Sequence, residues 1–196
     1  MHVEEIVEEI SKEGWDIRET FAYFGRAFYM ASVFEVGLAH ALLFSDFLAK
    51  VSVQFRLTKG VGFDRKKYEI EFDAFIDKHF ALTLGNLIKR IDEMALFDDA
   101  LKKRIVAAKQ RRDFLTHHYW RERSMDFATF SGRAAMRKEL EDADNFQTLD
   151  RAIDAALKPK RAEIGIKDEW LEKHYQHIIC RLKEQESVSS QEQSGV

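Results

Sequence analysis

The sequence predicts an all-α fold, an antiparallel helical bundle in one domain. Apolar residues recur every three or four positions along most of the 196-residue chain, which is the spacing of one buried helix face. One proline and nine glycines are few for the many tight turns of a β-sandwich or barrel. Hydrophobic residues make up 45% of the composition, sixteen of them phenylalanine, so the chain has enough apolar side chains to bury a core.

The N-terminal part predicts two helices separated by a break. Apolar residues within 3–10 recur at helical spacing, and Gly14 and Trp15 are expected to end this first helix. Asp16 begins the second helix, because its carboxylate would accept hydrogen bonds from the first free N–H groups. We expect this helix to reach about Phe47 and its phenylalanines to lie in the core.

The middle of the chain predicts a connector followed by three helices. Apolar and polar residues alternate over 51–57, but a lone strand has no partner, so we interpret this segment as a fraying helix end or an extended connector. The apolar residues of 72–80 mark a short helix. Thr83 is expected to cap the next one. Asp98, or the aspartate after it, is expected to cap a longer helix that runs to about Trp120.

The C-terminal part predicts two more helices and a tail. One helix begins near Ser131 and continues until Pro159 stops it. A last helix at about 167–184 is an addition to the bundle. Residues 185–196 are polar and are expected to be disordered. The domain is therefore expected to span 1–184.

Composition predicts a soluble, cytoplasmic protein with no membrane association. A single cysteine excludes an internal disulfide and a cysteine-only zinc site, and is typical of a reducing compartment. The first residues are acidic and lack the apolar centre of a signal peptide. The two longest uncharged apolar stretches, which Glu35 separates, are too short to span a bilayer.

Positive charge is concentrated in one segment. The net charge of −3 predicts no particular partner, whereas residues 102–123 hold eight basic and two acidic side chains. Such a segment is typical of an anion-binding site, and also of a solvated helix face that an acidic neighbour neutralises. Lys109 and Arg111 belong to this segment and are candidate binding residues.

The end of the basic helix collects groups suited to phosphate chemistry. Asp113 and His117 are four residues apart and share one helix face, where the carboxylate would orient the imidazole. Arg112 and His117 are five residues apart, about 140° around and about 7.5 Å along a straight helix. They converge if the helix ends or bulges between them, if the arginine curls round, or if a second copy supplies one group. Paired copies are the most economical interpretation.

A guanidinium and an imidazole suit cleavage of RNA without a metal or cofactor. The planar fork of arginine matches phosphate oxygens and would stabilise the charge on the phosphorane. Histidine would take the proton from a 2′-hydroxyl or give one to the leaving oxygen. Arg112 and His117 are therefore the candidate catalytic pair.

The pattern Arg112-Asp113-x-x-x-His117 resembles the Arg-(polar)-x3–5-His motif of the HEPN superfamily. Its extension to Tyr119 resembles the Arg-x4-His-x-Tyr form of HEPN toxins that are paired with minimal nucleotidyltransferase antitoxins. The resemblance implies a dimeric helical bundle that acts as a metal-independent endoribonuclease. By the same resemblance Asp113 is the supporting polar residue of the catalytic set, and Tyr119 matches a tyrosine that the antitoxin nucleotidylates.

Each candidate also has a structural interpretation. The arginine would pair with an acid, either Asp113 or Glu35 of the first long helix. The first histidine would be satisfied at the helix end, where its cation suits the helix dipole, and His118 would be its surface neighbour. Tyr119 and Trp120 would pack under the loop that follows them.

Two other functions remain open beside the nuclease. The first is a non-catalytic bundle that binds nucleotide, RNA or a partner protein through the basic face, with His118 and Tyr119 among its contacts. The second is a structural homodimer whose basic face is neutralised internally. A metal site at His174, His177 and Cys180 is disfavoured, because no fourth ligand accompanies them.

Overall fold

The computed structural model describes residues 3–141 and 145–194, and the side chains of 11–141 and 146–185. In these residues every regular element is a helix, so the predicted all-α class is confirmed there. The helices are α1 (Val3–Leu42), the π-helical turn η1 (Leu43–Phe47), α2 (Leu48–Thr58), α3 (Arg65–Phe80), α4 (Leu84–Glu93), α5 (Asp99–His117), α6 (Tyr119–Glu122), α7 (Ser124–Phe127), α8 (Phe130–Glu141), α9 (Asn145–Glu163) and α10 (Asp168–Ser194).

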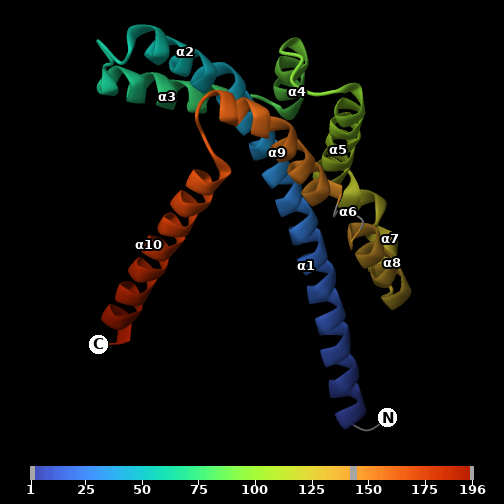
Figure 1. Ribbon diagram of the computed structural model, residues 1–196. Coiled ribbons are helices and arrows are strands. Elements are labelled where there is room, and N and C mark those ends of the chain that lie inside the picture. The colour runs from blue at the N-terminus through green and yellow to red at the C-terminus, as the bar shows by residue number, and fades with distance from the viewer. Residues whose placement is uncertain (1–2, 142–144, 195–196) are drawn as a thin grey trace.

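The long helix α1 is the axis of the molecule, and α4, α5, α8 and α9 pack along it, whereas α2, α3 and α10 extend away from one end (Figure 1). The predicted break at Gly14 is wrong, because α1 continues through this residue. A glycine inside a helix costs only about 1 kcal/mol, and the apolar face continues on both sides. Of the two interpretations of 51–57, the extended connector is wrong, because the segment is the last part of a helix. The helical path continues through η1 into α2 and ends at Lys59, which has a left-handed backbone (φ 52°).

Three helix starts have the side-chain caps that define them. Asp64 accepts a hydrogen bond from the backbone N–H of Lys67, so α3 begins earlier than the predicted helix. The caps expected at Thr83 and Asp98 are both confirmed, since each side chain accepts a backbone N–H three residues on. Helix α5 ends at His117, three residues before the predicted end.

The helix predicted from 131 to 158 is two helices, α8 and α9, and the residues between them lie outside the described part of the chain. Pro159 does not stop α9, which continues to Glu163. Proline removes only one helical hydrogen bond, the one from its own position to the carbonyl of Ala155. Pro159 is exposed, so its ring does not clash with neighbouring helices. Helix α10 extends from Asp168 to Ser194, so it ends later than the predicted boundary at 184.

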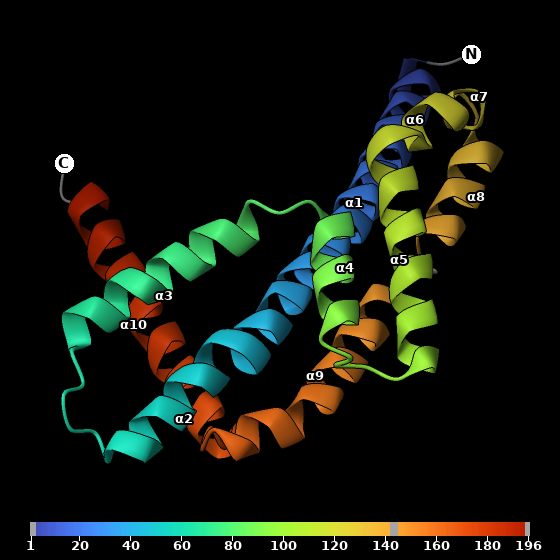
Figure 2. The same cartoon turned by 90° about the horizontal axis from the view of Figure 1, so that it is seen from above.

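The core lies where α1 packs against α4, α5, α8 and α9 (Figure 2). Its most completely buried apolar residues include Phe34, Leu38, Leu42, Ile91, Ile105, Leu115, Tyr119, Met136, Phe146 and Ile153. The first part of α1 departs from the prediction, because Phe21 and Phe28 are exposed. The ring of Phe21 instead covers Trp120 and Phe127 at the edge of the core.

The continuous helical path from Ser11 to Thr58 contains an 18-residue window with a mean hydropathy of 1.6, which is long and apolar enough to cross a membrane. Glu35 divides this apolar region into two uncharged stretches, each too short to span a bilayer, whereas a window that includes Glu35 is long enough. In the structure 44% of that window is buried. The buried side of this helical path includes Phe34, Leu38 and Leu42, which belong to the core.

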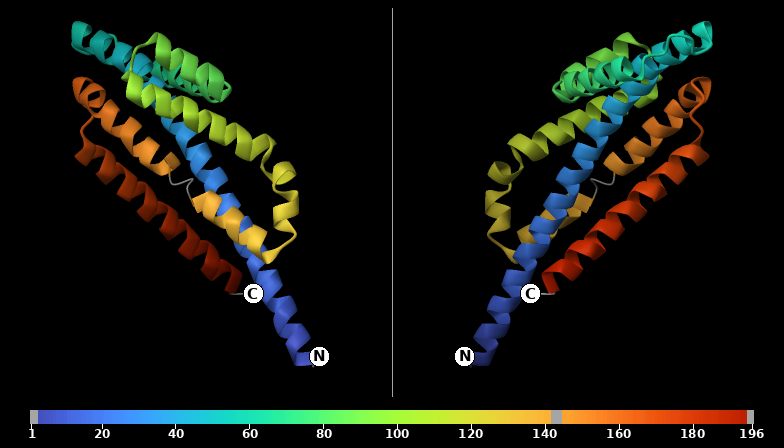
Figure 3. Two further views of the ribbon diagram at one scale, coloured as in Figure 1. Left: turned by 90° about the vertical axis from the view of Figure 1, so that its right-hand side faces the viewer. Right: turned by 90° about the vertical axis from the view of Figure 1, so that its left-hand side faces the viewer.

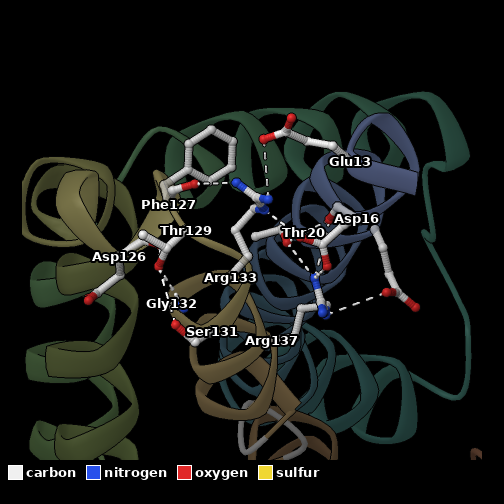
Figure 4. A network of polar contacts seen from close by, with 11 residues as sticks. Glu13, Asp16, Thr20, Asp126, Phe127, Thr129, Ser131, Gly132, Arg133 and Arg137 are labelled. Atoms are coloured by element: carbon white, nitrogen blue, oxygen red, sulfur yellow. Dashed lines mark hydrogen bonds and ion pairs between the residues drawn. The ribbon is translucent and has the colours of Figure 1, made fainter. Parts of the chain in front are cut away.

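A buried network of ions joins α8 to the first half of α1 (Figure 4). The guanidinium of Arg133 is only 2% exposed and pairs with the Asp16 carboxylate. Arg137 Nη1 lies 2.6 Å from the other oxygen of Asp16 and donates to the Thr20 hydroxyl at 2.9 Å. Asp16 therefore joins α1 to α8 and does not cap a helix, which corrects its predicted role.

Gly132 is required where α7 meets the start of α8. A Cβ added there would lie 2.0 Å from the backbone oxygen of Asp126, so Gly132→Ala is expected to lower the free energy of unfolding by about 1–3 kcal/mol. Gly25→Ala is the control, because its added Cβ meets nothing within 4 Å and should stabilise α1 by about 0.5–1 kcal/mol. Urea unfolding of both variants measures the difference. Equal stability of the two would contradict the close approach.

Candidate functional site

The candidate motif lies on the last two turns of α5, and this helix is regular from Asp99 to His117. Arg112 and His117 therefore belong to one uninterrupted helix and point in directions about 140° apart. The backbone leaves the helix only at His118 (φ −126°), after which α6 begins. The structure therefore excludes the first of the expected alternatives, in which a helix end or bulge between Arg112 and His117 brings their side chains together.

Arg112 is positioned by two carboxylates. Its Nε lies 2.5 Å from Oε1 of Glu35, which α1 supplies, and its Nη1 donates to Oδ1 of Asp113 at 3.4 Å. The arginine side chain is 28% exposed, so it lies at the rim of the helix packing. The remaining terminal nitrogen, Nη2, makes no hydrogen bond or ion pair among the residues that the structure describes. The guanidinium is held in place, and Nη2 keeps its capacity to donate hydrogen bonds.

Asp113 does not hold His117 as expected. Lys109 Nζ lies 2.5 Å from Oδ2 of Asp113, one turn earlier on the same face of α5. This hydrogen bond, with the nearby charges of Lys109 and Arg112, lowers the pKa of Asp113 against the opposing effect of its burial. Asp113 therefore remains an anion at neutral pH. Lys109, Arg112, Asp113 and Glu35 together carry no net charge.

His117 is exposed, and no hydrogen bond or ion pair involves it among the described side chains. Its nearest ring neighbour is His118, with ring centroids 6.3 Å apart. The Nδ1 of His118 is 2.6 Å from a guanidinium nitrogen of Arg121, so this second imidazole has a partner of its own. Among the described residues of the motif, His117 is the candidate proton-transfer group that is exposed and makes no hydrogen bond or ion pair.

Arg111 belongs to a separate ion cluster that joins α5, α8 and the start of α7. Both Arg111 and Arg123 bind the carboxylate of Glu139, the latter through two hydrogen bonds at 2.8 and 3.1 Å. Arg111 also donates to the backbone oxygen of Glu139 at 2.8 Å. Both guanidinium groups lie over the ring of Phe114. Arg111 therefore has a structural role here and is not free to bind a ligand.

Glu139 makes the stability of this cluster depend on pH. The hydrogen bond from Arg123 is the largest cause that lowers the Glu139 pKa below 4.5, so its stabilisation is complete above that pH and is lost as the pH falls through the folded pKa. Glu139→Gln is expected to cost about 1.5–3 kcal/mol at pH 7 and less near pH 3. Urea unfolding at both pH values tests this. Exposed Glu122→Gln is the control, and equal losses in both variants would contradict the assignment.

Tyr119 is buried in the core, with 0% of its surface exposed. Its hydroxyl donates to the backbone oxygen of Met136 at 3.3 Å, and its ring packs against Phe24 and Phe114. Burial is the main cause that raises the pKa of Tyr119 to about 12. The expectation that Tyr119 binds a ligand or accepts a nucleotidyl group does not fit this structure, because a nucleotide cannot reach the hydroxyl.

Much of the basic segment is neutralised within the fold. Lys102, Lys109, Arg111, Arg112 and Arg123 each lie within 4.0 Å of an acidic oxygen. Lys103 and Arg104 have no ion pair in the part of the chain that the structure describes. Fewer positive charges are therefore available to an anion than the eight basic residues of this segment suggest.

A metal site is not formed by the described residues, among which no group of three or more histidine, cysteine, aspartate or glutamate side chains could hold an ion. The ring of His174, which the sequence singled out, stacks on Trp170 with centroids 5.1 Å apart. Comparison of the chain with models of protein families, with curated proteins and with solved structures finds no match.

Proposed function

We propose that this protein is a HEPN-like helical bundle that cleaves RNA without a metal, with Arg112 and His117 as the catalytic pair. The observation that carries the proposal is the guanidinium of Arg112, which Glu35 and Asp113 hold at the rim while Nη2 keeps its capacity to donate hydrogen bonds. His117 lies exposed at the end of the same helix. We place the protein in the cytoplasm as a homodimer, in line with its composition and its HEPN-like motif.

The proposed reaction needs one proton acceptor and one charge stabiliser. The 2′-hydroxyl oxygen attacks the phosphorus as its proton passes to His117, the P–O5′ bond breaks, and the leaving 5′-oxygen takes a proton from solvent water, after which His117 returns its proton to solvent. The products are a 2′,3′-cyclic phosphate and a free 5′-hydroxyl. Arg112 stabilises the negative charge on the phosphorane through its free N–H groups. Asp113 is a positioning residue in this scheme, since it contacts the guanidinium and not His117.

A second copy of the chain is part of this proposal. Glu35 fixes Arg112 toward α1, whereas His117 lies on a stripe with Lys109 and Asp113. Helix geometry sets the two residues about 140° apart on α5, so in this proposal a phosphate bound by Arg112 of one copy meets His117 of the other. Tyr119 takes no part, and an antitoxin that modifies it is not proposed.

The test is incubation of the purified full-length protein with labelled single-stranded RNA in EDTA, with the ends of the products identified. Cleavage that leaves cyclic phosphates and persists in EDTA supports the proposal. Intact RNA under all buffer conditions, at protein concentrations where the chain is a dimer, overturns it.

The second candidate is a non-catalytic bundle that binds RNA or nucleotide. Lys103 and Arg104 favour it, because they are exposed and have no ion pair in the described part of the chain, so their charge is open to phosphate. The neutral set of Lys109, Asp113, Arg112 and Glu35 favours the structural dimer instead, because its charges are balanced within the fold. This function predicts binding without turnover, with an affinity that falls as the salt concentration rises. A fluorescence-polarisation titration at two salt concentrations separates it from a purely structural dimer, which predicts no RNA affinity.

A further inference from the structure

Helix α10 has an apolar stripe that the rest of the chain leaves uncovered. Leu171, Tyr175, Ile178 and Leu182 are spaced four, three and four residues apart, which is the seam of a coiled coil. Tyr175, Ile178 and Leu182 are 59%, 44% and 50% exposed. A stripe of this spacing is normally buried against a second helix, because each side chain fits a hole between four residues of its partner.

Two ion pairs join the start of α10 to the body of the molecule. Asp168 in its first turn binds Lys158 at 2.9 Å and Arg161 at 3.1 Å, both from α9. Gly165, with φ 84°, makes the sharp turn between the two helices. Beyond this turn, α10 has no extended packing against another helix in the part of the chain that the structure describes, and Figure 1 shows it diverging from α1. Figure 3 shows, from the side, how the chain folds back from α9 into α10.

We propose that α10 pairs with α10 of a second copy as a parallel two-stranded coiled coil. In this register Tyr175 and Leu182 occupy the a positions and Leu171 and Ile178 the d positions. The helix is 27 residues long, about 40 Å, which is sufficient for such a seam.

The charges beside the stripe select the parallel orientation. The g positions are Lys167, His174 and Arg181, and the first e position is Glu172. In a parallel pair a g residue faces the e residue five positions later on the other helix, so Lys167 meets Glu172 of the second copy. In an antiparallel pair g faces g, and the basic residues would repel one another. The charges therefore favour a second copy of the chain, bound in parallel, as the partner of this apolar stripe.

The first experiment measures the mass of the full-length chain in solution by light scattering after size exclusion. The wild type is expected at about twice its 22.9 kDa, and Ile178→Asp at 22.9 kDa, because the aspartate would be buried in the seam. Cys180→Asp adds the same charge on the outer face of α10 and should remain dimeric. A monomeric wild type, or a dimer that Ile178→Asp leaves intact, overturns the proposal.

The second experiment tests orientation. Glu172→Lys should weaken the dimer about threefold, and the double variant Lys167→Glu, Glu172→Lys should restore it. Oxidation of Ile178→Cys in a Cys180→Ser background should give a disulfide-linked dimer, because identical d positions face each other only in a parallel pair. No crosslink, or a dimer that Lys167→Glu alone strengthens, overturns the parallel arrangement. These measurements need no RNA, so their outcome is independent of the proposed nuclease activity.

Discussion

His117→Ala is expected to reduce RNA cleavage by about 100-fold to 10,000-fold, since a positioned imidazole contributes a factor of this size to proton transfer. The side chain is exposed and has no described partner, so its removal should leave the melting temperature unchanged. The loss should therefore fall on the chemical step. Single-turnover cleavage of a labelled RNA, with thermal unfolding of the same preparation, measures both quantities.

His177→Ala is the matched control for this prediction, because it removes an equally exposed imidazole from α10, away from α5. Its cleavage rate should equal that of the wild type. Arg112→Ala should match the loss of His117→Ala, and Arg112→Lys should recover little, because an ammonium group lacks the planar fork. A cleavage rate unchanged by either alanine substitution would remove both residues from the reaction.

Mixing Arg112→Ala with His117→Ala distinguishes a shared site from one within a single chain. If each site takes its arginine from one copy and its histidine from the other, half of the mixed dimers are heterodimers and each holds one intact site. Activity should then return to about a quarter of the wild-type level. A site formed within one chain gives no recovery, which would contradict the arrangement across two copies.

The sequence predicted correctly those helix starts that depend on interactions between residues close together in the chain. The caps at Thr83 and Asp98 were predictable because each side chain binds a backbone N–H three residues on. Asp16 and Glu19 resemble a capping box equally well, yet Asp16 binds Arg133, which is 117 residues away. Gly14 was misread as a break for the same reason, since tertiary packing of α1 outweighs the small cost of one glycine.

The candidate site was predictable as a set of residues on α5, but not as a set of contacts. The structural interpretation of Arg112 predicted that it pairs with Glu35 or Asp113, and in the structure it binds both. Helix spacing places Asp113 between Lys109 and His117 on one face, and spacing alone cannot tell which neighbour the carboxylate takes. Tyr119 is buried because α1 and α8 pack against it. The sequence around Tyr119 does not indicate that these two distant helices come together there.

Asp16→Ala is expected to lower the free energy of unfolding by about 3–5 kcal/mol, since it leaves Arg133 buried without its carboxylate. One guanidinium nitrogen of Arg133, Nη2, already lacks a hydrogen bond. Without Asp16 the contacts that remain are the Phe127 carbonyl, the Phe130 ring and Glu13 at 3.6 Å, and none of them replaces the buried carboxylate. Arg133→Met should cost less, because Asp16 would keep Arg137 and the methionine would fill the space. Urea unfolding of the two variants shows which one loses more free energy of unfolding.

Burial alone would raise the pKa of Asp16, but hydrogen bonds and charges from Arg133 and Arg137 outweigh it and lower the pKa below 3.8. The stabilisation from Asp16 is therefore complete above that pH and is lost as the pH falls through the folded pKa, so the penalty of Asp16→Ala should shrink in acid. The exposed pair of Arg65 and Glu69 is the control, and Glu69→Ala should cost only about 0.3–0.5 kcal/mol. If Asp16→Ala cost no more than Glu69→Ala, the network would not be what holds α8 against α1.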